Sequence, residues 1–230
     1  MPYRQLDERS ILDTLAQVKQ RVCERFPGSG LSNVATELLS VGSEVMETVE
    51  FLKRPIYRVR VPVWIGIAVM IASSVWVLAS VLPKVRVGEV DFVQVFEAGA
   101  NDVALIGISI YFLLSIETRI KRNRALRILH ELRSLAHVVD MHQLGKDPEL
   151  LAAARVSGEE VLTPAQLGKY LDHCNDLLAV TSKLAAMLVQ YFSDEVVLGT
   201  VNEIEALTAG LSARIWQKIT LLERPRLASL

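Results

Sequence analysis

The sequence has few of the residues that stabilise small secreted proteins or form zinc sites, since its 230 residues include only two cysteines, Cys23 and Cys174. Two thiols so far apart in the chain do not form a disulfide scaffold or a cysteine-rich metal cluster, and we expect both to be reduced. Charge of one sign is not in excess either, with 25 Lys and Arg against 26 Asp and Glu. Without a basic excess, nucleic acid is not an expected partner.

Common catalytic and cofactor-binding signatures are also missing. The chain has no HExxH motif and no nucleophile elbow. Gly145-Lys146 lacks the upstream glycine of a Walker loop, and Gly28-Ser29-Gly30 follows a predicted helix, whereas a dinucleotide fingerprint follows a strand. The TVGYG filter of potassium channels is absent. We therefore expect a protein that is not an enzyme and has no cofactor.

The clearest feature that is present is an apolar run at residues 61–82, VPVWIGIAVMIASSVWVLASVL, which has 22 residues and no ionisable side chain. As a helix it is about 33 Å long, close to the thickness of the hydrocarbon core of a bilayer. Trp64 and Trp76 lie toward its two ends, where interfacial anchors are found. The run predicts a first transmembrane helix over residues 61–82.

A second, shorter apolar run leads to a dense group of cations. Residues 103–116 reach only about 21 Å as a helix, but a chain that has crossed a membrane must return or stay outside. We predict a second transmembrane helix over 103–118. The cations that follow are interpreted as topology determinants that also meet anionic lipid headgroups. They are Arg119, Lys121, Arg122, Arg124 and Arg127.

The charges around the two runs predict an orientation. Cations precede residue 61 and follow residue 118, whereas the connector 83–102 is mainly acidic. By the positive-inside rule, both termini are cytoplasmic and the connector is extracytoplasmic. The first ten residues have no apolar signal-peptide core, so the first span is expected to act as a signal-anchor. This topology fits a multi-pass protein of the plasma membrane, with the bacterial inner membrane as the expected case.

Residues 92–118 allow two interpretations. One continuous helix would place Gln94, Glu97 and Asn101 on one face, where polar groups must avoid lipid and become candidates for an ion pathway, together with Asp102. In the favoured alternative, Asp91 caps a short helix in the connector, Gly99 ends it and Asn101 caps the second span. The acidic residues are then interfacial, and Asp102 lies in the first turn of the span.

The remaining sequence predicts an all-α protein. Helical periodicity covers most of residues 1–60, interpreted as an N-terminal cytoplasmic hairpin, and most of residues 119–230, interpreted as a cytoplasmic bundle. The helix of the second span is expected to continue over 121–144, and a short helix is predicted over 149–155. Thr163-Pro164-Ala165-Gln166 predicts a capping box at the start of a long helix, which pairs with another starting near Asp194.

Two groups of ligand-type residues are candidates for metal or catalytic sites. His130, His137 and Asp140 share helical spacing and form a weak candidate for a divalent metal. Asp172, His173 and Asp176 fall opposite an apolar stripe and are interpreted mainly as a solvated face. For the first group, packing and hydrogen bonding within the bundle are the favoured roles.

Small residues in the spans predict close helix packing. Gly66, Ser73 and Ser80 recur every seven residues in the first span, and Ala100, Ala104 and Gly107 line the second. These positions pack the two spans together or pack several copies of the chain.

The sequence thus favours a non-enzymatic, homo-oligomeric membrane protein whose cytoplasmic helices bind copies of the chain or a cytoplasmic partner protein. The alternative is an oligomeric cation channel or transport component with Glu97 or Asp102 in a ring at its extracytoplasmic mouth. A metal sensor or an enzyme is the third and weakest hypothesis.

Overall fold

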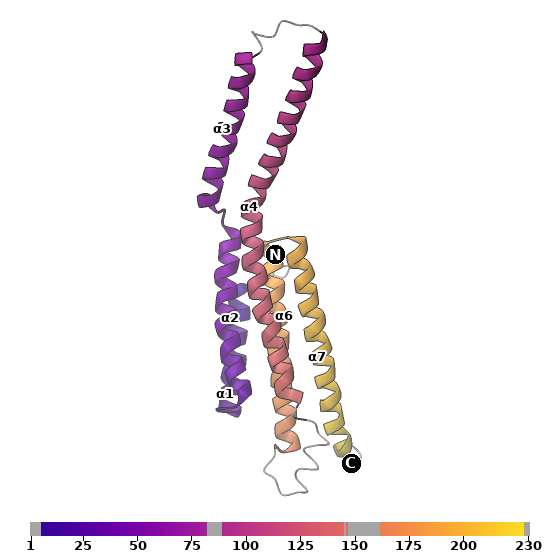
Figure 1. Ribbon diagram of the computed structural model, residues 1–230. Helices are drawn as coiled ribbons and strands as arrows, with labels where there is room; N and C mark the ends of the chain where they lie inside the picture. The colour runs from indigo at the N-terminus through magenta and orange to yellow at the C-terminus, as the bar shows by residue number, and fades with distance from the viewer. Residues whose placement is uncertain (1–5, 82–88, 145, 147–161, 228–230) are drawn as a thin grey trace. The chain divides into compact units, whose positions relative to one another are not determined.

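The computed structural model describes residues 6–81, 89–144, 146 and 162–227, with side chains described except at 77–78, 81, 89–99, 102 and 223–227. All elements in these ranges are α-helices, and no strand occurs among them (Figure 1). The expected short helix over 149–155 lies outside the described residues. The helices are α1 (Glu8–Arg25), α2 (Gly30–Lys53), α3 (Tyr57–Val81), α4 (Glu89–Leu144), α6 (Pro164–Tyr191) and α7 (Glu195–Leu227).

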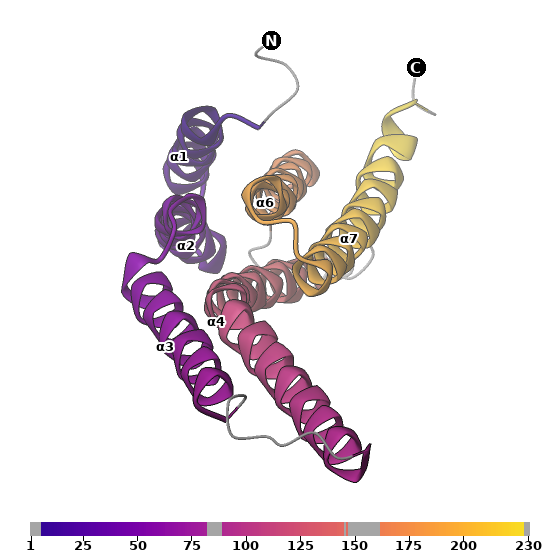
Figure 2. The ribbon, with the colours of Figure 1, turned by 90° about the horizontal axis from the view of Figure 1, so that it is seen from above.

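The chain divides into two compact units. Residues 54–121, with α3 and the first part of α4, form one unit, which we call the apolar unit. Residues 1–53 and 122–230 form the other, which we call the bundle. The bundle joins α1 and α2 from the start of the chain to the second part of α4, α6 and α7, as the view in Figure 2 illustrates.

One apolar core runs through the bundle and takes side chains from all five of its helical segments. Leu15 of α1, Leu38 of α2, Leu132 of α4, Leu178 of α6 and Ile215 of α7 are each completely buried. These residues belong to helical stripes spaced three and four apart, which is the pattern that buries one face of a helix. The core explains why the termini of the sequence, far apart along the chain, fold together.

Local signals place the helix ends. Thr163 accepts a hydrogen bond from the Gln166 amide at 3.2 Å, and the Gln166 side chain accepts one from the Thr163 amide at 2.8 Å. The predicted capping box is therefore confirmed. Between α1 and α2, Gly28 has a φ of 68°, a left-handed conformation that glycine adopts at little cost. The α1–α2 connection turns there.

Gly42 marks a close approach of α2 to α1 and α6. A Cβ atom at this position would lie 2.9 Å from Leu15 Cδ2 and 3.7 Å from Leu184 Cδ1. Since α1, α2 and α6 contact one another in the bundle, a side chain larger than hydrogen would be driven into the core at this point. Gly210 of α7, by contrast, has nothing within 4 Å of such an atom.

We predict that Gly42→Leu lowers the free energy of unfolding of the bundle by about 1–3 kcal/mol, because the added atoms overpack the core. Thermal and urea unfolding of the purified protein, followed by circular dichroism, measures the change. Gly210→Leu is the matched control and is expected to leave stability unchanged or slightly raised. Equal effects of the two substitutions would contradict tight packing at Gly42.

Candidate functional sites

The outer surface of the apolar unit is strongly apolar. Trp64, Val69 and Trp76 of α3 are 62%, 63% and 71% exposed, and Ile108 and Tyr111 of α4 are 67% and 76% exposed. Exposed apolar area of this extent is rare on proteins that live in water. Within the described residues, two helical stretches are long and apolar enough to cross a membrane, and 11% and 0% of their apolar windows are buried. Core helices of a soluble protein would be mostly buried.

Inside the apolar unit, Glu117 joins the two helices. Its carboxylate accepts a hydrogen bond from Arg60 Nε at 2.5 Å and lies 3.1 Å from Lys121 Nζ. The Ile56 amide also donates to Glu117 Oε1, at 3.4 Å. The sequence analysis did not single out Glu117. Its spacing of four residues from Lys121 was the one available signal, because Glu before Lys at i,i+4 forms a favourable pair on a helix.

The cations that follow the second apolar stretch make different kinds of contact. Arg119 lies over the Phe112 ring at 5.0 Å, and Lys121 pairs with Glu117. Arg124 lies over the Phe51 ring at 4.6 Å in the bundle. Arg127 is exposed. Part of this cationic run therefore makes contacts within the protein, in addition to the topology and lipid-headgroup roles that the sequence predicts for it.

Arg122 makes the best-defined polar contact of the bundle. Its Nε donates to both carboxylate oxygens of Asp194 at 3.0 Å, and its Nη2 donates to Oδ2 at 2.7 Å. Asp194 Oδ1 also accepts from the amides of Val196 and Val197, so this carboxylate caps α7. Asp194 is only 8% exposed. One carboxylate thus fastens α4 to the start of α7.

The surroundings of Asp194 fix its charge. Burial raises the pKa of its carboxyl, but the hydrogen bonds from the Arg122 guanidinium and from the Val197 amide outweigh burial and hold that pKa below its ordinary value. A lowered pKa in the folded state stabilises the fold above the unfolded-state pKa near 4. That contribution is lost as the pH falls through the folded-state value.

The polar positions of the second apolar stretch lie in one helix. Helix α4 is continuous from Glu89 to Leu144, so the favoured two-helix interpretation is wrong. Gly99 could end a helix with a left-handed conformation, but Gly28 is the one glycine with positive φ among the described residues. A glycine that keeps helical dihedrals costs a helix only about 1 kcal/mol. The helix therefore continues through Gly99.

Continuity of α4 places Gln94, Glu97 and Asn101 at spacings of three and four, on one face of the helix. Asp102 follows Asn101 directly. The Asn101 side chain is exposed, and the side chains of the other three positions lie outside the described part. The ion-pathway interpretation of this face stays a prediction.

The small residues of the apolar unit do not meet a neighbouring helix. A Cβ atom at Gly66 or Gly107 would have nothing within 4 Å, and Ser73 and Ala104 are exposed. Ser73 and Ser80 donate their hydroxyl hydrogen bonds to the backbone carbonyls of Met70 and Trp76 in their own helix. At the described positions, these small residues are left open for contacts outside a single chain.

The histidine candidates lie on the exterior of the bundle. His130 and His137 are exposed on α4, and Asp140 accepts a hydrogen bond from Gln143 Nε2 at 2.6 Å. Over the ranges described here, no group of three or more His, Cys, Asp or Glu side chains lies close enough to hold a metal ion. The three residues share one helix face without a further ligand from another helix.

Cys174 is placed in the core and cannot readily ionise. Its side chain is completely buried in α6, and burial raises the pKa of its thiol to about 12. Burial also raises the pKa of the neighbouring Tyr170. Because the thiolate is the reactive form of cysteine, a buried thiol of this kind has a structural role.

We predict that Arg122→Gln lowers the free energy of unfolding by about 1–3 kcal/mol at pH 7, because it leaves the buried Asp194 carboxylate without its cation. Denaturant unfolding at pH 7 and pH 3 measures this, and the loss should shrink at pH 3 as Asp194 takes up a proton.

Arg133→Gln is the matched control. The pair of Arg133 with Glu203 also joins α4 to α7, at 2.9 Å, but its side chains are 47% and 63% exposed. Its loss should stay below about 1 kcal/mol, and an equal loss in both variants would refute the assignment.

No protein-family model, no curated protein and no solved structure matches this chain.

Proposed function

We propose that this chain is a non-enzymatic integral membrane protein that crosses the bilayer twice and presents a helical bundle for assembly and partner binding. The spans are residues 61–82, of which α3 includes those up to Val81, and the stretch 103–118 of α4. The observation that carries this proposal is the exposure of large apolar side chains along both stretches, next to a bundle that buries its own apolar residues in one core. The hydrocarbon core of a bilayer can surround such a surface without the free-energy cost of exposing apolar side chains to water.

The helical backbone supports the same proposal. In hydrocarbon every backbone N–H and C=O group needs a partner within the protein, and a helix supplies these partners from its own segment. The side-chain hydroxyls of Ser73, Ser74 and Ser109 likewise donate to carbonyls within their own helices. These three hydroxyl groups therefore need no water molecule as a hydrogen-bond acceptor.

Charge distribution supports the orientation. Lys53, Arg54, Arg58 and Arg60 precede the first span, and the cationic run follows the second, so both ends of the pair are positive. The positive-inside rule then places the bundle in the cytoplasm and the connector 83–102 outside. A plasma membrane, as in the inner membrane of bacteria, fits this arrangement.

Assembly into a homo-oligomer follows from the open small residues. Gly66 and Gly107 face neither each other nor another described helix, and small residues allow helices to approach closely in lipid. A second copy of the chain is the partner that offers the same surface. The bundle can support such an assembly or bind a cytoplasmic protein.

We predict that the protein resists carbonate extraction from membranes and labels asymmetrically. In a chain with both native cysteines replaced, Lys84→Cys should react with a membrane-impermeant maleimide in intact cells. Ser193→Cys, exposed between α6 and α7, should react only after permeabilisation. The opposite pattern would reverse the orientation, and extraction by carbonate would show that the chain does not span the membrane.

We predict that native mass spectrometry of the protein in nanodiscs finds an oligomer, and that Gly66→Leu and Gly107→Leu shift it toward monomer. The larger side chains would keep the helices of adjacent copies apart. Gly199→Leu is the matched control, because Gly199 is equally open but lies in α7 of the bundle. A monomeric wild type would reject the assembly and also the ring on which a cation channel depends.

A further inference from the structure

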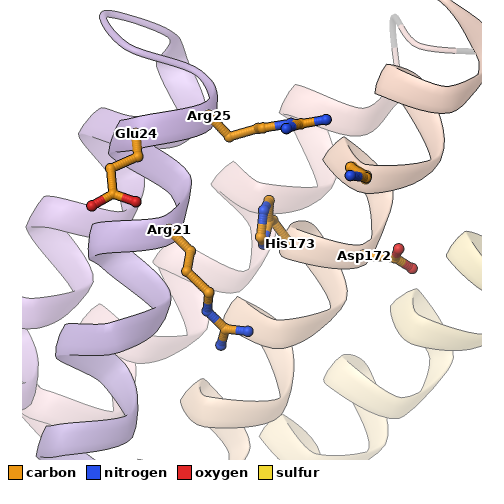
Figure 3. Close-up of a pocket in the computed structure, with 6 residues that line it drawn as sticks. Arg21, Glu24, Arg25, Asp172 and His173 are labelled. Carbon is orange, nitrogen blue, oxygen red and sulfur yellow. The ribbon is translucent and has the colours of Figure 1, made fainter.

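The bundle has a pocket between the C-terminal turns of α1 and the first turns of α6. Its volume is about 410 Å³, which lies within the range of small-molecule sites. It is lined by Arg21, Glu24 and Arg25 from α1 and by Lys169, Asp172 and His173 from α6, as Figure 3 shows. Helical periodicity places Asp172 and His173 on a solvated face of α6 and gives no sign that they lie near α1.

Two cations of this pocket, Arg25 and Lys169, are not paired with its acids. The Glu24 carboxylate accepts a hydrogen bond from Gln20 Nε2 at 2.8 Å, and Figure 3 shows it directed away from α6. The Asp172 carboxylate is directed away from α1 in the same view. Over the described ranges, neither Arg25 nor Lys169 has a carboxylate within ion-pair distance. Arg25 and Lys169 therefore supply positive charge to the space between the two helices, whereas Arg21 is paired with Asp176 at 3.9 Å.

His173 contributes an unused polar atom. Its Nδ1 is buried and has no hydrogen-bond partner among the described residues. The nearest carboxylate oxygen, Asp176 Oδ2, is 3.7 Å away and also lies 3.9 Å from Arg21. The Phe26 ring packs edge-on to the imidazole with 6.2 Å between ring centroids. Buried polar atoms without a partner are uncommon, and a bound ligand is one way to satisfy them.

A second hollow continues from this pocket and shares Glu24 and Arg25 with it. Its volume is about 700 Å³, and its other lining residues are Phe26, Pro27, Ser29, Leu162 and Gln166. The combined space is larger than a single inorganic anion needs. It offers an aromatic ring and neutral polar groups beside the cations, as suits the organic part of a ligand.

The position of the pocket favours a soluble ligand. It lies where α1 ends and α2 begins, whereas the chain leaves the bundle at the other end of α2, after Lys53. Helix α2 has 24 residues, which corresponds to roughly 36 Å along its axis. The pocket is thus at the end of the bundle far from its connections to the apolar unit.

We propose that this pocket binds the phosphate group of a small soluble organic phosphate, of about nucleotide size. Two guanidinium groups can hold phosphate oxygens through paired hydrogen bonds, and Lys169 adds a point charge. His173 supplies a further polar contact from α6. The bundle then acts as a ligand-responsive domain, because a ligand that contacts both α1 and α6 stabilises their packing.

Isothermal titration of the full-length protein in nanodiscs tests this proposal, with ATP, pyrophosphate and inorganic phosphate as separate probes at millimolar concentration. We expect saturable binding, tightest for ATP. Arg25→Gln and Lys169→Gln should each weaken it by about tenfold, since each removes a charged contact. Lys183→Gln, which removes an exposed cation from the same helix α6, should bind like the wild type. Melting temperatures of all variants verify that they are folded.

Three results would overturn the proposal. The first is no saturable binding of any of the three probes, and the second is equal weakening by Lys183→Gln and Lys169→Gln. The third comes from a parallel arm with lipid vesicles. Binding only to vesicles containing phosphatidylglycerol, and not to soluble phosphates or pure phosphatidylcholine, would assign the cations to lipid headgroups instead.

Discussion

Unbroken backbone hydrogen bonding along α4 is the constraint on which the rest of the structure depends. This helix has 56 residues, and both compact units include part of it. Before Lys121, described apolar side chains such as Ile108, Tyr111 and Leu114 are exposed. From Ala125 onward, Ile128, Leu129 and Leu132 are buried in the bundle core. One continuous helix thus has exposed apolar side chains in the apolar unit and buried apolar side chains in the bundle.

The transition from exposed to buried apolar side chains occurs over a few charged residues. Glu117 forms ion pairs with Arg60 and Lys121 within the apolar unit. Arg122 forms an ion pair with Asp194 within the bundle. A carboxylate that caps a helix and also accepts a bidentate arginine has its lone pairs satisfied, which is what a nearly buried charge requires. Cations that we expect to determine the topology therefore also fasten helices together.

The bundle and the apolar unit support different parts of the proposed function. The apolar surface, with its open small residues, is suited to lipid and to other copies of the chain. The bundle has one buried apolar core and places Arg25 at the end of α1 and Lys169 near the start of α6, where both line the pocket. A protein with these two parts can join a membrane-embedded assembly to a soluble signal.

The sequence by itself determined the all-α class, the two apolar stretches and most helix ends, because these depend on local periodicity, caps and length, as at Thr163 and Gln166. Only the tertiary structure decided which residues meet. The structure shows that α4 continues through Gly99. It also places Arg122 against Asp194, and Arg25 and His173 around one pocket, although no spacing rule connects these positions. Side-chain contacts between helices depend on how their faces are turned toward each other, and periodicity defines a face without naming its partner.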